Sequence, residues 1–250
     1  MELLLVSVVI VCFVLLQVIE VFSFGSRVAG KTMNQIALGY SLQQAVFTAS
    51  RFLLVLFLPA LAFLVESKIS IINYSLMASL ALFISALISF LILIKLNLSQ
   101  GFFQKVISNY QNTRIPRSIY LALFKNKNKK FIDININFHT KVVNKKKFLT
   151  SFTAYFFLSS GFFFAFLLSN IFYENRLTLS QITPFFHGIG ALLVAFYLDP
   201  MLSKSMDNEH DNILWMENIY SVLFGRISSY FFTAFLFVLI KVRPNFRTAT

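Results

Sequence analysis

Hydrophobic residues in this chain are gathered into six long segments, separated by shorter polar stretches. About 20 apolar residues in a helix cross the ~30 Å hydrocarbon core of a bilayer, and lipid offers no partner to a free backbone group. Each segment is therefore predicted to be a transmembrane helix in a single integral membrane domain, residues 1–250. The predicted spans of this all-α, polytopic membrane protein are 3–22, 37–64, 72–94, 149–172, 182–198 and 219–240.

The region between the third and fourth spans, residues 97–147, is polar and strongly basic. Between Lys105 and Lys147 it carries eleven Lys or Arg residues and one acid. By the positive-inside rule it is predicted to be a basic cytoplasmic loop, which places both chain ends outside. Within it, residues 102–110 and 118–124 are predicted to form short amphipathic helices on the membrane. Residues 132–138 alternate apolar and polar, which favours a small strand or hairpin.

The composition narrows the possible function classes. Hydrophobic residues make up 57% of the chain, and the net charge of +12 is concentrated in the basic loop, so the charge indicates topology and anionic lipid rather than nucleic acid. Cys12 is the only cysteine, so no disulfide or thiolate metal site is expected. With no phosphate-binding glycine loop, zinc-protease motif or nucleophile elbow, we predict no metal, no cofactor and no enzyme activity.

Arg51 is the most informative residue, because it lies near the middle of the second span. A guanidinium stays ionised there, and burying it at mid-membrane costs at least ~2.5 kcal/mol. It therefore needs an acidic partner, a water-filled cavity or an anionic ligand. One interpretation is an internal salt bridge that only holds helices together. The other, which we favour, is a path for an ion or a substrate.

Polar residues continue from Arg51 along one predicted face of the second span. Their spacing of four, four and three residues is that of a helical stripe. Such a stripe can line a polar groove, although hydrogen bonding between helices is the simpler explanation for its three neutral members. The stripe consists of Tyr40, Gln44, Thr48 and Arg51.

Four further charges are predicted to lie in the cytoplasmic half of the membrane. Glu20 ends the first span, Arg27 lies in the first loop, Asp199 ends the fifth span, and Arg226 lies about two turns into the sixth. Arginine binds phosphate through a planar fork of donors, so an inward-facing cavity lined by these groups suits an anionic headgroup. Taken singly, Glu20, Asp199 and Arg226 are each equally well explained by ion pairing or by a position at a helix end.

At these same residues the chain resembles the Amj-type (alternate) lipid II flippase family. Chain length and the number of spans are also similar, so the resemblance covers most of the chain. The matching stretches are Ile19-Glu20, Arg27-Val28-Ala29-Gly30, Ser50-Arg51 with Pro59, and Asp199-Pro200 with Ser203 and Asp207.

The resemblance implies translocation of lipid II, the undecaprenyl-diphosphate-linked peptidoglycan precursor, from the inner to the outer leaflet of a bacterial cytoplasmic membrane during cell wall synthesis. Arg51 and Arg27 are then expected to bind the diphosphate, with help from Arg226. Glu20 and Asp199 are expected to orient these arginines or to balance their positive charge. The expected partners are lipid II and membrane lipids. Two alternatives are a membrane scaffold of the cell-envelope machinery and a transporter of another anionic lipid or solute.

Overall fold

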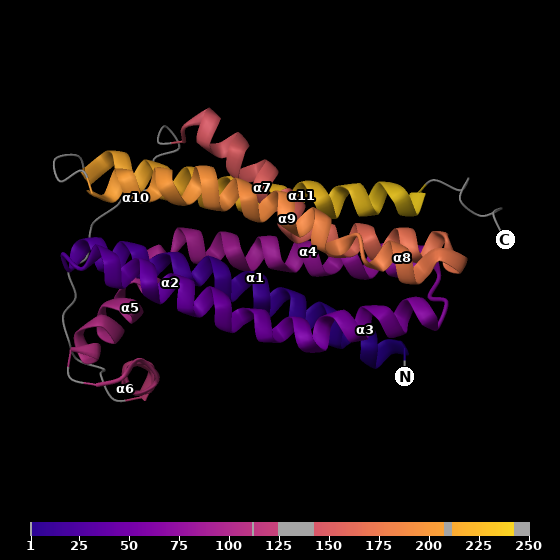
Figure 1. Ribbon diagram of the computed structural model, residues 1–250, viewed down its shortest axis with the longest axis horizontal. Coiled ribbons are helices and arrows are strands. Elements are labelled where there is room, and N and C mark those ends of the chain that lie inside the picture. Colours follow the sequence, from indigo (N-terminus) through magenta and orange to yellow (C-terminus); the bar gives the residue numbers. More distant parts are fainter. Residues whose placement is uncertain (1, 112, 125–142, 208–211, 243–250) are drawn as a thin grey trace.

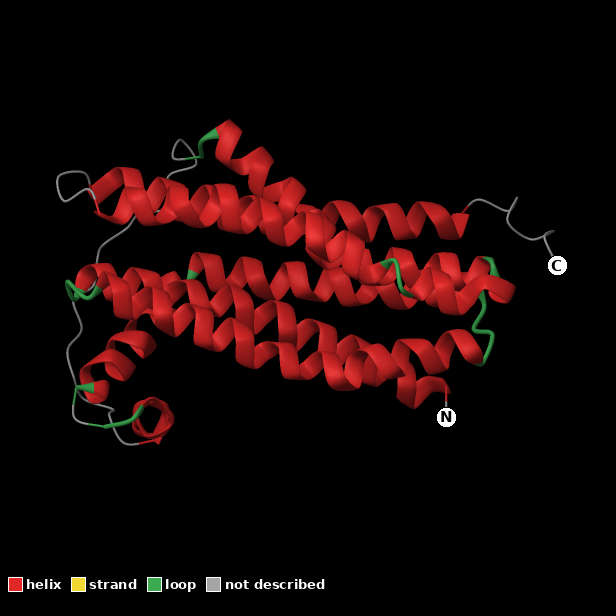
Figure 2. Ribbon diagram, viewed as in Figure 1, coloured by secondary structure: helices red, strands yellow, loops and turns green. Residues whose placement is uncertain are grey.

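The computed structural model describes residues 2–111, 113–124, 143–207 and 212–242. Within these ranges the chain is helical and contains no strand (Figure 2). Six helical segments of the described chain are long and apolar enough to cross a membrane, which confirms the predicted all-α, six-span architecture. The strand or hairpin predicted at 132–138 lies outside the described residues.

The first half of the chain contains three of these spans and two shorter helices. Helix α1 forms the first span, and the second is built from α2, the 3₁₀ turn η1 and α3. Helix α4 is the third span, and α5 and α6 follow it in the basic region. The bounds are α1 Glu2–Thr32, α2 Ile36–Ser50, η1 Arg51–Leu53, α3 Leu54–Glu66, α4 Ile71–Ile94, α5 Leu96–Tyr110 and α6 Ile115–Phe124.

The second half contains the remaining three spans. Helix α7 is the fourth and α11 the sixth. The fifth is a composite of short helical pieces that includes a π-helical turn, η4. The bounds are α7 Lys145–Ile171, η3 Tyr173–Asn175, α8 Arg176–Ser180, α9 Thr183–Leu193, η4 Val194–Leu198, α10 Asp199–Asp207 and α11 Asn212–Val242.

The spans run side by side as an elongated bundle (Figure 1). Helix α1 packs against α2, α3, α4 and α5, and α11 packs against α4 and α7. We call the end that carries the α1–α2 turn together with α5 and α6 the basic-loop end. The opposite end carries the α3–α4 turn and the turn after α7. Two large apolar clusters fill the bundle, one around Phe13, Phe57 and Phe163 and one around Trp215 and Leu223.

Helices α1 and α2 approach closely because glycines face each other near the basic-loop end. A Cβ atom built on Gly39 would lie 2.6 Å from the carbonyl oxygen of Ser26 and 2.8 Å from the Cα atom of Gly30. The Ser26 hydroxyl also donates a hydrogen bond of 2.9 Å to the Gly39 carbonyl. This contact fixes the register between the two helices, and with it the positions of Arg27 on α1 and Gln43 on α2.

Three predicted boundaries are corrected by the structure. Arg27 lies on α1 rather than in a loop, because the helix continues to Thr32. Asp199 does not end the fifth span, which runs from Tyr173 to Asp207. The helix predicted at 102–110 begins earlier, at Leu96, and packs along α1 instead of lying freely on the membrane.

Candidate functional site

A carboxylate shared by two arginines lies inside the bundle, between the two apolar clusters. Glu20 on α1 is buried, and its Oε2 atom accepts a hydrogen bond of 2.5 Å from Nη2 of Arg226 on α11. Its Oε1 atom lies 3.2 Å from Nη2 of Arg51 on η1. The first, second and sixth spans therefore meet at one acidic side chain.

Neutral polar groups complete the surroundings of Arg226. Its Nη2 atom donates to Oε1 of Gln17 at 2.9 Å, and its Nε atom donates to the hydroxyl of Tyr230. The Tyr230 hydroxyl in turn donates to Gln17 Oε1 at 2.6 Å. The guanidinium also lies over the ring of Tyr155, 4.4 Å from its centre. Hydrogen bonds of this kind are what make a buried ion pair tolerable. We call Gln17, Glu20, Arg51, Tyr155, Arg226 and Tyr230 the arginine cluster.

A second ion pair lies nearer the basic-loop end. Arg27 is buried and donates to Oδ1 of Asp199 through Nη2 and to Oε1 of Gln43 through Nε. Tyr40 covers the guanidinium, with its ring centre 4.7 Å away. The Nη1 atom of Arg27 is buried and has no hydrogen-bond partner among the described residues. A buried donor without an acceptor is costly.

The charges of these two groups do not cancel. Three guanidinium groups face two carboxylates, which leaves one cation in excess. The side chains of Arg27 and Arg226 are each 1% exposed, whereas that of Arg51 is 26% exposed. Arg51 also has the longer contact with Glu20 and lies over the ring of Phe47, 4.3 Å from its centre. Arg51 is therefore the arginine best placed to bind a further anion.

Two cavities lie beside these arginines, between the second and fifth spans. One of about 450 Å³ is lined by Arg51 together with Pro184, His187 and Gly188 of α9. The other, of about 60 Å³, is lined by Arg226, Asp199 and the glutamines of α2. Both cavities are bordered by the same three residues, Phe47, Tyr155 and Val194. The two cavities therefore adjoin each other, with Asp199 and Arg226 lining the smaller and Arg51 the larger, and we call the pair of cavities the route.

Both spans that border the route depart from regular α-helix where they meet it. The second span has its 3₁₀ turn at Arg51–Leu53, and the fifth has its π turn at Val194–Leu198. Such irregular backbone within a membrane is tolerated where it lines a cavity, and it often marks a hinge. The fifth span is also the least buried of the six, with 17% of its most apolar window inside the protein.

The predicted polar stripe is only partly gathered at this site. Tyr40 covers Arg27, and Gln44 lines the smaller cavity. Thr48 is exposed and lines neither cavity. By contrast, the structure brings together the five charged residues singled out in the sequence, in two adjacent groups: Glu20, Arg51 and Arg226 in one, and Arg27 and Asp199 in the other.

Several residues of the site were not found from the sequence. Gln17 lies three residues before Glu20, and Tyr230 lies four residues after Arg226, so each shares a helix face with the charge it contacts. A search for polar side chains one turn away from each charge identifies both. The polar pattern favours Gln44 over its neighbour Gln43, and Tyr155 gives no signal because it stands among many other aromatic residues.

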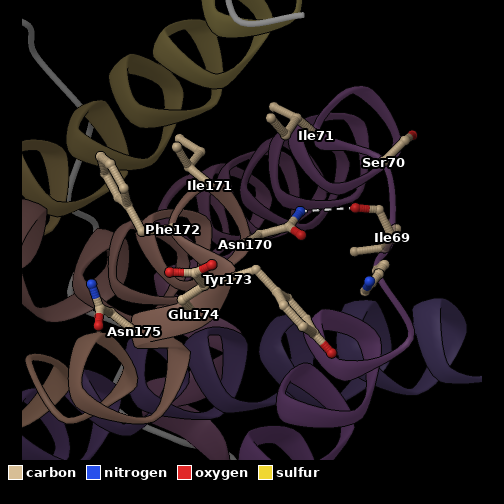
Figure 3. Close-up of a pocket in the computed structure, with 10 residues that line it drawn as sticks. Ile69, Ser70, Ile71, Asn170, Ile171, Phe172, Tyr173, Glu174 and Asn175 are labelled. Carbon is tan, nitrogen blue, oxygen red and sulfur yellow. Dashed lines mark hydrogen bonds between the residues drawn. The ribbon is translucent and has the colours of Figure 1, made fainter. Parts of the chain in front are cut away.

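A third cavity, of about 610 Å³, lies at the opposite end of the bundle (Figure 3). It is formed where the α3–α4 turn meets the end of α7. Asn170 Nδ2 donates a hydrogen bond of 2.8 Å to the carbonyl of Ile69 across this junction. The cavity is lined by one cation, Lys68, and one anion, Glu174, so it lacks the excess positive charge of the arginine cluster.

We compared the chain with known protein families, curated proteins and solved structures, and none of the three comparisons finds a match. The two ion-pair groups and the cavities between the second and fifth spans are therefore the features from which a function can be inferred.

Proposed function

We propose that this protein is a lipid II flippase of the Amj type, which moves the undecaprenyl-diphosphate-linked precursor across a bacterial cytoplasmic membrane for peptidoglycan synthesis. One observation supports this proposal above the others. Arg51, the partly exposed member of an arginine cluster with one cation in excess, borders a 450 Å³ cavity in the middle of a membrane span. A fixed cation at this depth lowers the barrier for a multiply charged diphosphate.

The ion-pair geometry suggests how the diphosphate is bound. Arg226 is held by four protein groups and keeps Glu20 in place. Arg51 has one acidic partner among the described residues, at 3.2 Å, so a phosphate can replace that carboxylate without breaking the Arg226–Glu20 bond. Glu20 then acts as the resting counter-charge of Arg51. In the same way, the unpartnered Nη1 atom of Arg27 offers a donor at the start of the route.

Translocation follows from the succession of the two cavities. The headgroup enters near Arg27 and Asp199, passes Arg226 and reaches Arg51, while the isoprenoid tail remains in lipid. The smaller cavity, of about 60 Å³, is far too small to hold the headgroup. Passage therefore requires the fifth span to move away from the second. The π turn beginning at Val194 is the natural hinge for that movement.

The deciding experiment is complementation with a matched biochemical assay. Bacteria depleted of their main lipid II flippase receive either this protein or its Arg51→Ala form, and outer-leaflet lipid II is then labelled. Restoration by the intact protein and loss in the variant are expected, with equal amounts of both in the membrane. If the intact, well-expressed protein restores no labelling, it is not a lipid II flippase. Vesicles that contain other anionic lipids then distinguish a transporter of a different lipid.

A membrane scaffold of the cell-envelope machinery is the second candidate, because Arg27 and Asp199 form an ion pair that would hold two spans together without any ligand. Replacing both residues, as Arg27→Met with Asp199→Leu, removes the charges but keeps apolar packing. Such replacements of buried pairs are often neutral for stability. A scaffold would keep its cellular function with this double substitution, whereas the flippase would lose transport.

A further inference from the structure

Helix α6 lies across the direction of the membrane spans. In Figure 1 the spans run along the length of the picture, whereas α6 is seen almost end-on at the basic-loop end. A helix perpendicular to a bundle of spans, at the level where those spans end, lies in the plane of the membrane surface. Its ten residues are too few to cross a bilayer, so a position in the interface is the one that fits its length.

The two faces of α6 differ in what they contact. Ser118 and Ala122 are buried toward α5, and the hydroxyl groups of Thr113 and Ser118 lie 2.8 Å apart, which fixes the turn between the two helices. The opposite face carries large apolar side chains that no described residue covers. The exposed fractions are 60% for Tyr120, 59% for Leu123 and 68% for Phe124.

Positive charge lies at the start of this helix, next to an open cavity. Arg114 and Arg117 are exposed, and residues 96–124 contain no acidic residue. Arg114 also lines a shallow cavity of about 630 Å³, formed by the α5–α6 turn and the start of α2. Gln35, Tyr110 and Thr113 line the same cavity. Their hydrogen-bonding groups beside a cation suit a phosphorylated headgroup.

We propose that α6 and this cavity form a binding site for an anionic phospholipid of the leaflet at the basic-loop end. The headgroup phosphate lies between Arg114 and Arg117, and the headgroup occupies the cavity. Tyr120, Leu123 and Phe124 enter the acyl region beneath it. The site is separate from the arginine cluster, and it anchors α5, which packs along α1 beside the Gly30–Gly39 contact. The proposal does not depend on the substrate of the transport route.

The test places a reporter on the exposed face of α6 in the full chain. Leu123→Cys, made together with Cys12→Ser, is labelled with an environment-sensitive fluorophore and reconstituted into nanodiscs of phosphatidylcholine and phosphatidylglycerol. Lipids that carry a nitroxide near the headgroup are expected to quench the label, and nitroxide phosphatidylglycerol more strongly than nitroxide phosphatidylcholine. Each arginine near an anionic surface contributes roughly a fivefold preference for the anionic lipid. The double substitution Arg114→Gln with Arg117→Gln should therefore bring the ratio of quenching by the two nitroxide lipids close to one.

Lys145 and Lys146 provide a matched control, because both are exposed at the start of α7. Replacing both with Gln removes the same charge and is expected to leave the preference unchanged. If the two nitroxide lipids quench the label equally in the protein that keeps Arg114 and Arg117, the site has no preference for anionic lipid and the proposal is overturned. Quenching by aqueous iodide but not by lipid nitroxide shows that α6 is not in the membrane. Protection from both quenchers shows that protein covers this face, and also overturns the proposal.

Discussion

Arg51 lies 3.2 Å from Oε1 of Glu20, while the other carboxylate oxygen of Glu20 is held at 2.5 Å by Arg226. The two arginines therefore share one acid unequally, and Arg51 is the one that can exchange its partner for a ligand. Its side chain also borders the larger of the two cavities.

Replacing Arg51 with Ala is expected to abolish most transport without unfolding the protein. Glu20 keeps Arg226 as its partner in this variant, so no buried charge is left alone. A charge-assisted hydrogen bond contributes about 1.5–3 kcal/mol, which corresponds to a rate lower by about tenfold to a hundredfold. Arg51→Lys keeps the charge but loses the planar fork, so an intermediate rate is expected. Flipping of fluorescent lipid II in proteoliposomes measures both variants.

Replacing Glu20 with Gln is expected to destabilise the fold more than any Arg51 substitution. Arg226 would then be a fully buried cation without an acid, and breaking such a pair costs roughly 3–5 kcal/mol. The free energy of unfolding in mixed micelles tests this expectation. Asp199→Asn is the comparison: Asp199 is 22% exposed, so water compensates Arg27 in part and the loss should be smaller. Equal losses would show that burial does not set the cost.

Replacing Gly39 with Ala is expected to separate α1 from α2 near the basic-loop end. The new methyl group would lie 2.6 Å from the Ser26 carbonyl, and relief of such overpacking costs about 1–3 kcal/mol. Gln43, one turn further along α2, would move away from Arg27 as a result. Gly101→Ala on α5 is the control, because its Cβ would meet nothing within 4 Å and a helical Gly→Ala change stabilises by up to ~1 kcal/mol. The unfolding temperatures of the two variants test this expectation: Gly39→Ala should unfold at a lower temperature than the unsubstituted protein, and Gly101→Ala should not.

The spans could be predicted from sequence because apolar length is a direct physical requirement of the bilayer. The residue at which the first helix ends could not be predicted in this way. Helix α1 continues through Ser23, Ser26 and Arg27 because α2 and α5 bury that stretch, and because the two serine hydroxyls bond to carbonyls of their own helix, each at 2.7 Å. Burial of this kind depends on distant parts of the chain, and no local polarity pattern reveals it.

The charged residues of the site could be predicted because an ionised group inside a membrane span requires a partner. The face of the second span that meets the site could not be predicted in this way. The face of the second span that meets the site carries Tyr40, Gln43, Phe47 and Arg51, at spacings of three, four and four. Phe47 is apolar and interrupts the polar pattern, so a stripe chosen by polarity alone moves to Gln44 and Thr48 instead.

A larger side chain at position Gly188 would fill the larger cavity, and it tests the route without changing any charged residue. Gly188 lines the 450 Å³ cavity, and a Cβ atom on it would meet nothing within 4 Å. Gly188→Leu therefore places an apolar side chain in the space beside Arg51 without forcing neighbouring atoms apart. Transport in proteoliposomes is expected to fall by at least about tenfold, while the unfolding temperature stays the same or rises.

The matched control for this substitution is Gly101→Leu, which adds an identical side chain in open space on α5, away from the route. Normal transport is expected in that variant. Gly190→Ala provides the opposite case, because its Cβ would lie 2.6 Å from Leu158 Cγ and 2.8 Å from the Ala154 carbonyl, so stability should fall. If Gly188→Leu transports lipid II at the normal rate, the headgroup does not pass through this cavity, and Arg51 serves the fold rather than the substrate.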